Sequence, residues 1–210
     1  MRHGKYEIRR GHTPEAEDIN GQENSSEKNV LAYLHDLAYL ISAVLLVFLL
    51  LFRVVVVSGP SMQNTLIDGD YLLLISNTFY KDPQPGDIIV ASKESFENGD
   101  PIVKRVIATE GQTVDIDFDA GIVYVDSVAL EEDYTLTPTT LSEGTQFPLV
   151  VDEGCVFVMG DNRNISLDSR STQIGLIDCR EILGKAVFLF LPGTNKGATP
   201  RQFDRIGVLS

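Results

Sequence analysis

Histidine is missing from most of this chain. His3, His12 and His35 all lie in its first 35 residues, ahead of an apolar run that ends at Val57. If that run crosses a membrane, the part of the chain beyond it contains no histidine at all. A Ser–His–Asp triad, a Cys–His transpeptidase centre and a histidine-ligated metal site are then excluded from residues 58–210. Any nucleophilic enzyme built there must use another base.

Cysteine is scarce as well. The chain has two, Cys155 and Cys179, and their spacing matches neither a zinc site nor a C-x-x-C redox pair. We therefore expect no metal ion and no organic cofactor. If the segment is exported the two cysteines could form a disulfide, and the sequence leaves that pairing open.

Basic residues are few after residue 57. Residues 1–57 carry 6 Lys+Arg and 7 Asp+Glu, whereas residues 58–210 carry 11 and 23, so nearly all of the net charge of -13 lies in the second segment. A polyanionic domain repels phosphate, and we expect no nucleic-acid partner. The acidity is interpreted as a solvated surface.

The one long apolar run covers residues 37–57, 21 residues with Arg53 as their single charge. As a helix rising about 1.5 Å per residue, it would span about 31 Å, the thickness of a bilayer core. A buried helix of a soluble protein seldom stays apolar on every face. A cleaved signal peptide would have a shorter apolar run, followed by a small-x-small site. The run predicts a transmembrane helix over residues 37–57, with Arg53 reaching toward the interface.

Basic residues also predict the orientation of that span. Five precede it, and the first one after Arg53 is Lys81. The positive-inside rule then places the N-terminus in the cytoplasm and residues 58–210 outside, in a single-pass protein of the plasma membrane. Residues 1–36 are expected to form a largely disordered cytoplasmic tail.

Short β-type runs dominate the rest of the chain. They are rich in β-branched and aromatic residues and cover residues 71–75, 87–90, 102–107, 113–116, 122–125, 155–159 and 186–190. This pattern predicts a mostly β fold, a compact antiparallel barrel or sandwich-like catalytic domain after the N-terminal helix. Residues 126–150 are expected to be a polar excursion and residues 195–210 a loose tail.

With histidine excluded, the base must be a carboxylate or a lysine, and Lys104 is the candidate lysine. On a strand it shares its face with Ile102 and Val106, and apolar surroundings lower the pKa of a lysine until its amine can accept a proton. The alternative is a lysine at a sheet edge that deters aggregation.

Two further segments contain candidate site residues. Ser61 follows Gly59 and Pro60 in a tight turn that could present a hydroxyl and backbone N–H groups to an oxyanion. Residues 160–170 are dense in Asp, Asn, Ser and Arg, which can form charge-assisted pairs, and Ser166 could orient a lysine amine. A calcium loop is the alternative, although the spacing does not match an EF-hand.

Taken in order, these segments resemble type I signal peptidases (leader peptidases), a Ser–Lys serine protease family, and in particular its short single-span bacterial members. The matching segments are the apolar run, residues 58–66, Asp68-Gly69-Asp70, Lys104-Arg105-Val106 and residues 160–170. The likeness covers residues 37–192, and four motifs in this order are specific even though each alone is modest.

The resemblance implies a membrane-bound serine endopeptidase that removes N-terminal signal peptides from exported preproteins at small-x-small sites through an acyl-enzyme. It implies that Ser61 is the nucleophile, that Lys104 is the general base and that Ser166 helps to hold the Lys104 amine in place. It also implies that Asp161, Asp168 and Arg170 support the site through ion pairs. Met62 would belong to the apolar substrate-binding surroundings, and Ser58 would assist the Ser61 N–H in the oxyanion hole. Its implied partners are preproteins and the lipid bilayer, and we expect a monomer.

Three positions depart from the family pattern. Asn64 replaces a usual proline, Asn164-Ile165 replaces an Asp-Asn pair, and Gly59 stands where some members carry a hydroxyl donor. None of these changes removes Ser61 or Lys104, so an active enzyme is expected. Alternatives are a self-cleaving repressor, which would need a DNA-binding helical pair, and an inactive surface-binding domain.

Overall fold

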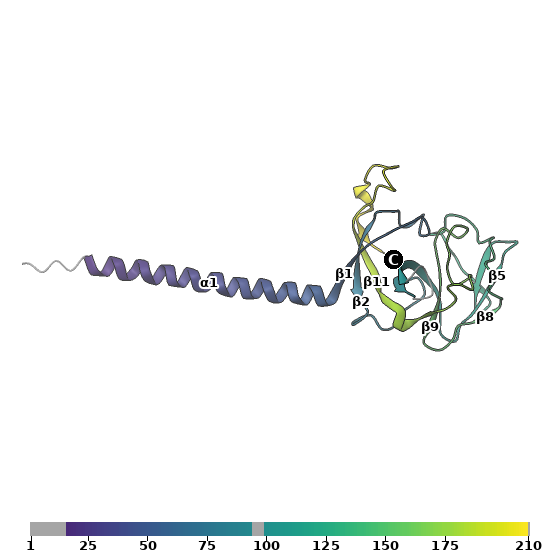
Figure 1. Ribbon diagram of the computed structural model, residues 1–210, viewed down its shortest axis with the longest axis horizontal. Helices are drawn as coiled ribbons and strands as arrows, with labels where there is room; N and C mark the ends of the chain where they lie inside the picture. The colour runs from purple at the N-terminus through teal and green to yellow at the C-terminus, as the bar shows by residue number, and fades with distance from the viewer. Residues whose placement is uncertain (1–15, 94–98, 210) are drawn as a thin grey trace, which may run out of the picture. The chain divides into compact units, whose positions relative to one another are not determined.

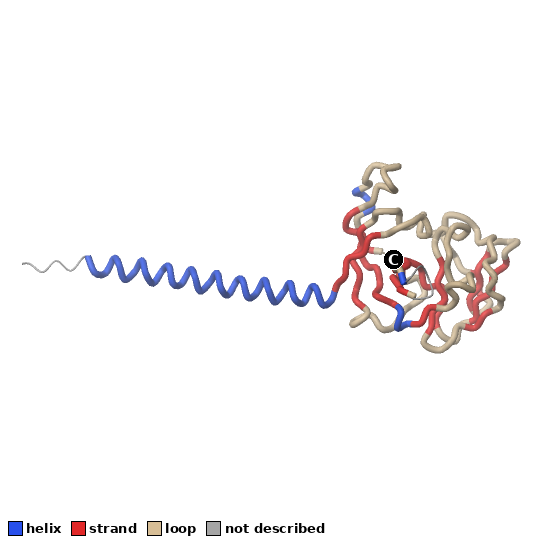
Figure 2. The backbone as a smooth tube through the Cα atoms, in the orientation of Figure 1, coloured by secondary structure: helices blue, strands red, loops and turns tan. Residues whose placement is uncertain are grey.

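The computed structural model describes residues 16–93 and 99–209, with side chains from Asn29 onward. The chain separates into two units, residues 1–48 and residues 49–210. Helix α1 (Ala16–Leu51) runs through the first unit, and the second is built mainly of strands (Figures 1 and 2).

Helix α1 differs from the predicted transmembrane helix at both ends. Its apolar part, Asn29–Leu51, is 23 residues long with a mean hydropathy of 2.3, and none of it is buried within the protein. The prediction that residues 52–57 continue the helix is wrong, because strand β1 (Phe52–Val56) begins there and pairs with strand β2 (Tyr71–Ser76). A run of valines favours extended backbone, and the ladder to β2 satisfies its hydrogen bonds.

The predicted disordered tail is wrong for residues 16–36, which are helical. No proline falls between Ala16 and Leu51 to interrupt the hydrogen-bond ladder of the helix. Residues 1–15, which belong to the same predicted tail, lie outside the described residues.

The second unit contains two antiparallel sheets. The larger has the strand order β1, β2, β11 (Ile182–Leu191), β3 (Ile88–Ser92), β4 (Pro101–Thr109), β9 (Cys155–Met159) and β10 (Ile177–Asp178), with β12 (Gly207–Val208) also paired to β11. The smaller has the order β7 (Val128–Ala129), β6 (Ile122–Val125), β5 (Thr113–Asp117) and β8 (Leu149–Val150). The mostly β, antiparallel prediction is confirmed. Among the described strands, β1 and β10 lie at the two ends of the larger sheet and do not pair with each other, so it is not a closed barrel.

The central strands β3 and β4 are buried on both faces, which explains their nearly continuous apolar sequences. Val90 and Val103 pack in one core cluster, whereas Ile89 and Val106 pack in a second. A third cluster joins β4 and β9 to the smaller sheet through residues such as Phe157. The charged side chains of β4 are thus held in the interior of the unit.

The predicted loose tail over residues 195–210 is wrong. A short 3-10 helix, η3 (Phe203–Arg205), precedes β12, and Arg205 Nη2 lies 2.7 Å from the fully buried Asp70 Oδ2. The predicted polar excursion, residues 126–150, contributes β7 and β8 to the smaller sheet. Cys155 and Cys179 are unpaired and pack against different core clusters, Cys179 at the start of a second 3-10 helix, η2 (Cys179–Glu181).

Candidate active site

Ser61 lies in the loop that joins β1 to β2. The loop is closed at its base, where Val57 N donates to Asp70 O at 2.8 Å and Gly69 N donates to Val57 O at 2.9 Å. Asp68 Oδ1 accepts from Gly59 N at 2.8 Å, and Gly59 has φ +89°, a conformation that favours glycine. These contacts hold the loop that carries Ser61 in one conformation.

Lys104 reaches Ser61 from the middle of β4. It is 4% exposed, and its Nζ donates to Ser61 Oγ at 2.8 Å, although the two residues are 43 positions apart. Burial lowers the pKa of Lys104 from 10.5 to about 8, and the negative charge of Asp168 opposes part of that shift. A neutral amine in contact with a serine hydroxyl can accept its proton.

The Ser61–Lys104 pair lies in a groove of about 490 Å³, which is lined mostly by apolar residues but exposes nearly as much polar as apolar surface. Val55 and Val57 line one side, and Ile102 and Val103 of β4 line another. Among the described strands β1 pairs with β2 alone, and β4 pairs with β9 only from Arg105 onward. The groove is therefore bordered by two strand edges that no other described strand covers, at Val55 and Val56 and at residues 101–104.

Two residues predicted to assist binding line the same groove. Ser58 is exposed there, three residues before Ser61. Met62 is 1% exposed and belongs mainly to the core cluster beneath the loop. Ile165, one of the departures from the family pattern, also borders the groove and is 64% exposed.

The loop after β9 binds the backbone of the serine loop. Asn162 N donates to Ser61 O at 3.0 Å, and Asn162 Nδ2 donates to Pro60 O at 3.2 Å. A Cβ at Gly160 would lie 2.2 Å from Ser166 Oγ and 2.5 Å from Ser61 O, so only glycine allows both to pack against this position. Gly160 was not among the predicted site residues, although its place between an apolar strand and a polar cluster is a usable signal.

Asp161 is fully buried and receives two parallel hydrogen bonds from Arg105, each 2.9 Å long. Thr65 of the serine loop also donates to Asp161, and the Arg105 guanidinium lies 4.1 Å from the centre of the Tyr134 ring. Arg105, Thr65 and Tyr134 were not predicted, because strand alternation turned Arg105 away from Lys104 and nothing in the sequence linked the other two to the site.

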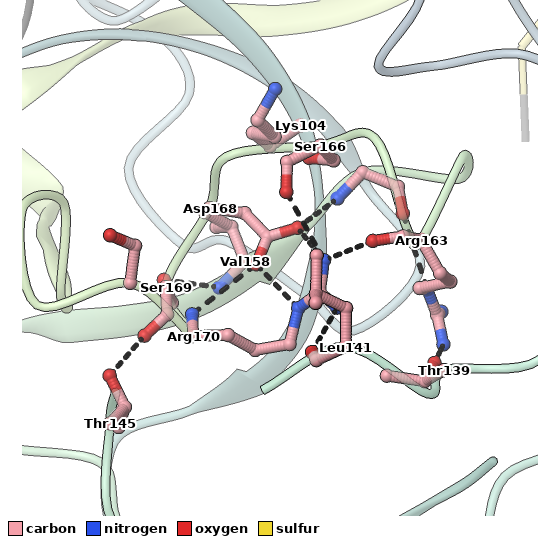
Figure 3. A network of polar contacts seen from close by, with 12 residues as sticks. Lys104, Thr139, Leu141, Thr145, Val158, Arg163, Ser166, Asp168, Ser169 and Arg170 are labelled. Atoms are coloured by element: carbon pink, nitrogen blue, oxygen red, sulfur yellow. Dashed lines mark hydrogen bonds and ion pairs between the residues drawn. The ribbon is translucent and has the colours of Figure 1, made fainter. Parts of the chain in front are cut away.

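Asp168 and Arg170 form a second buried pair, with Arg170 Nε 2.8 Å from Asp168 Oδ1 and Nη2 2.9 Å from Oδ2 (Figure 3). Asp168 Oδ2 also accepts from Gly160 N at 3.0 Å. Arg170 in turn donates to the carbonyl oxygens of Leu141, at 3.1 Å, Arg163 and Ser166. The pair therefore ties the loop to its neighbouring segments.

Ser166 is fully buried, and its Oγ has no hydrogen-bond partner among the described residues. It lies against Gly160, as the Ser61 carbonyl does. The Ser166 Oγ makes no hydrogen bond to the Lys104 amine, so the predicted contact that would hold the amine is not formed. Ser61 and Lys104 line the groove, whereas Asp161, Asp168 and Arg170 are buried in the loop after β9. In residues 16–93 and 99–209, no three His, Cys, Asp or Glu side chains are grouped to hold a metal ion.

Comparisons with known proteins identify the family to which the chain is similar. The profile of the family described as "Signal peptidase, peptidase S26" matches residues 30–191. The chain is 39% identical over 149 residues to a probable signal peptidase I-1 of Synechocystis sp., covering 67% of this chain and 72% of that protein. It is 35% identical over 156 residues to a signal peptidase I of Bacillus licheniformis, covering 70% and 81%.

A crystal structure of a signal peptidase I from Enterococcus faecalis is 32% identical to the chain, with a TM-score of 0.42. The match covers 50% of this chain and 97% of the Enterococcus faecalis chain. The match of the family profile extends over most of the chain, from within α1 to the end of β11. The chain belongs to the peptidase S26 family of signal peptidases.

Proposed function

We propose that this protein is a membrane-anchored serine endopeptidase that removes N-terminal signal peptides from exported preproteins through Ser61 and Lys104. The observation that carries the proposal is the 2.8 Å contact between Lys104 Nζ and Ser61 Oγ inside an apolar groove. A buried lysine whose pKa is lowered to about 8 can act as a base near neutral pH.

The reaction proceeds through acylation and deacylation, and Lys104 takes up and gives back a proton in each stage. Its neutral amine takes the proton of Ser61 as the Oγ attacks the scissile carbonyl, and the ammonium then gives that proton to the leaving amine. Lys104 next takes a proton from water as the water oxygen attacks the ester, and the ammonium returns that proton to Ser61 Oγ as the acyl C–O bond breaks. The oxyanion is stabilised by the Ser61 backbone N–H, with Ser58 as its helper.

The groove supports the choice of substrate. Residues 101–104 and β1 present strand edges there, so a peptide can bind in extended form by adding backbone hydrogen bonds. The apolar walls suit small side chains at the first and third residues before the cut, as in Ala-x-Ala. Met62 underlies this surface, while Asp161, Asp168 and Arg170 keep the loops in place.

The apolar part of α1 is proposed to anchor the enzyme in the plasma membrane, with the N-terminus in the cytoplasm and the catalytic unit outside. Its 23 residues suffice to cross a bilayer core. Preproteins are held in the same bilayer by their signal segments, and confinement to one surface raises the effective concentration of the cleavage site. We expect the enzyme to act as a monomer, without a metal ion or cofactor.

The proposal is tested with the detergent-solubilised full chain and a preprotein that carries an Ala-x-Ala site. Ser61→Ala and Lys104→Ala are each expected to abolish cleavage, and Lys196→Ala, at an exposed lysine, should keep it. Cleavage is read by gel electrophoresis and the cut site by mass spectrometry. Full activity of Ser61→Ala would refute the proposal, and a parent that cuts no preprotein would favour a binding domain.

A further inference from the structure

We infer that Asp100 is a specificity-determining residue that favours a basic side chain at about the fifth residue before the cut in the preprotein. The inference rests on the proposed function, and it names a feature of the substrate that the small-x-small rule does not contain. Asp100 belongs to none of the sequence motifs. It lies directly before β4, the strand that carries Lys104.

The backbone places Asp100 in line with β4. Ser92 of β3 pairs with Pro101, and Ser92 Oγ donates to Gly99 O at 2.6 Å, so the chain is held on both sides of Asp100. Steric contact with a proline ring disfavours helical backbone at the residue before it. Asp100 therefore continues the extended course of β4, and side chains alternate along such a chain. Four residues before Lys104, the Asp100 side chain lies on the same side of the strand.

Asp100 supplies the negative charge of the groove. Of the residues that line the groove, Asp100 and Lys104 are the two charged ones. Asp100 is exposed, and no described cation lies within ion-pair distance of its carboxylate. Lys93, the nearest basic residue before it in the sequence, donates instead to two backbone carbonyls. The Asp100 carboxylate is thus available to a side chain of the substrate.

Extended geometry gives the position of that side chain in the substrate. The residues before the cut are proposed to bind along residues 101–104, where Ile102 and Val103 line the groove. A strand and an extended peptide both advance by about 3.3 Å per residue. With the first residue before the cut beside Lys104, the fifth lies beside Asp100, about 13 Å away along the strand. The first, third and fifth side chains of the peptide point to the same face.

The charge of Asp100 should act on substrate binding rather than on the chemical step. Asp100 lies further from the reacting atoms than the Debye length of about 10 Å in 0.1 M salt, so its influence on kcat is screened. An exposed ion pair contributes little, and an exposed like-charge pair opposes binding by a similar amount. A preprotein with lysine at the fifth position should therefore be preferred over one with glutamate by about three- to tenfold, mainly through KM.

The test uses full chains in non-ionic detergent and two preproteins that differ only in having lysine or glutamate at the fifth residue before an Ala-x-Ala cut. At about 0.01 M salt, the ratio of the two kcat/KM values should be about three to ten for the parent, close to one for Asp100→Asn and inverted for Asp100→Lys. About 1 M salt should remove the preference of the parent. Asp119→Asn removes the same charge at an exposed position outside the groove, and it should keep the preference.

Several outcomes would overturn the inference. Equal cleavage of the two preproteins by the parent would do so, as would an unchanged preference in Asp100→Asn or a lost preference in Asp119→Asn. Two further preproteins carry lysine or glutamate at the second residue after the cut. A preference at that position that disappears in Asp100→Asn would show that the other end of the substrate lies beside Asp100, and it would contradict the assignment.

A binding measurement separates this inference from the proposed function. Fluorescent peptides with lysine or glutamate at the fifth position, and a non-hydrolysable CH2–NH bond at the cut, are titrated into the parent and Asp100→Asn, and anisotropy gives Kd. The lysine peptide should bind the parent about three- to tenfold more tightly, and Asp100→Asn about equally. If Ser61→Ala still cuts preproteins, the proposed mechanism fails, while this titration still reports on Asp100. If Ser61→Ala and Lys104→Ala are inactive but the parent binds both peptides equally, the protease stands and the role of Asp100 is refuted.

Discussion

The chain contains two Asp-x-Arg pairs of the same local design, and only one of them is part of the site. Asp168 and Arg170 are both fully buried, whereas the Arg180 side chain is 90% exposed and that of Asp178 31% exposed. In both pairs the Arg Nε and one Nη donate to the carboxylate, and in both the aspartate also accepts the arginine's own backbone N–H.

The difference between the pairs lies in what surrounds them. Asp178 caps the short helix η2, and its pKa falls to about 2 because Arg180 donates hydrogen bonds to it in water. Arg170 instead also donates to three backbone carbonyls, two in its own loop and one at the distant Leu141. An exposed ion pair is worth little, whereas a buried one becomes costly to break, because the remaining charge has lost both water and partner.

The largest effect is expected when the buried pair is broken. Asp168→Asn leaves the Arg170 guanidinium buried without a counter-charge, and it should lower the free energy of unfolding by about 3–5 kcal/mol. Urea unfolding followed by tyrosine fluorescence in detergent solution measures the loss. Cleavage should fall as well, because the carbonyls of Ser166 and Leu141 are held by the same arginine.

Asp178→Asn is the matched control for that change. Asparagine still caps η2, and the exposed Arg180 remains solvated, so unfolding and cleavage should both match the parent within error. Equal losses in the two variants would show that burial does not distinguish the pairs.

Lys104→Met is expected to raise the free energy of unfolding, whereas Asp168→Asn lowers it. A charge buried without a carboxylate at ion-pair distance costs stability, so replacing it with an apolar side chain of similar length should raise the free energy of unfolding at pH 7 by about 1–3 kcal/mol. Cleavage should be lost at the same time. A less stable variant, measured by the same urea unfolding, would contradict the burial cost.

The pH dependence of stability follows from the same lysine. Its pKa is about 8 in the folded protein and 10.5 when unperturbed, so between these values the unfolded chain holds more protons. The stability of the parent should therefore rise with pH from about 8 toward 10.5, and below pH 8 the full cost of about 3 kcal/mol is present. Lys104→Met should lack this rise.

A loss between those of the buried and the exposed pair is expected at a pair of intermediate burial. Arg205, whose side chain is 19% exposed, donates to both oxygens of the fully buried Asp70. Asp70 also accepts from Ile67 N and Gly193 N, so Arg205→Gln should cost about 1–2 kcal/mol, less than Asp168→Asn. Urea unfolding of Arg205→Gln is compared with that of Asp70→Asn. A loss at Arg205 as large as at Asp168 would contradict the ranking by burial.

Much of the fold could be predicted from local patterns. Runs of β-branched residues between turn residues marked β2, β3, β4, β5, β6, β9 and β11, because strand preference and two-residue alternation act locally. The end of the helix could not be predicted, because the valines of β1 are as apolar as the residues before them. Their backbone pairing with β2 decides that they are a strand. The docked C-terminal segment depends likewise on a distant residue, Asp70.

The sequence by itself determined which chemistry is available. Because no histidine follows residue 35, its motifs favoured Ser61 as the nucleophile and Lys104 as the base. Motif order also identified the segments that meet at the groove. Only the tertiary structure decided which charged side chains form ion pairs with one another there. Arg105 binds Asp161 and Glu132 binds Arg163, because the folding of separate segments sets which side chains are buried and which partners they meet.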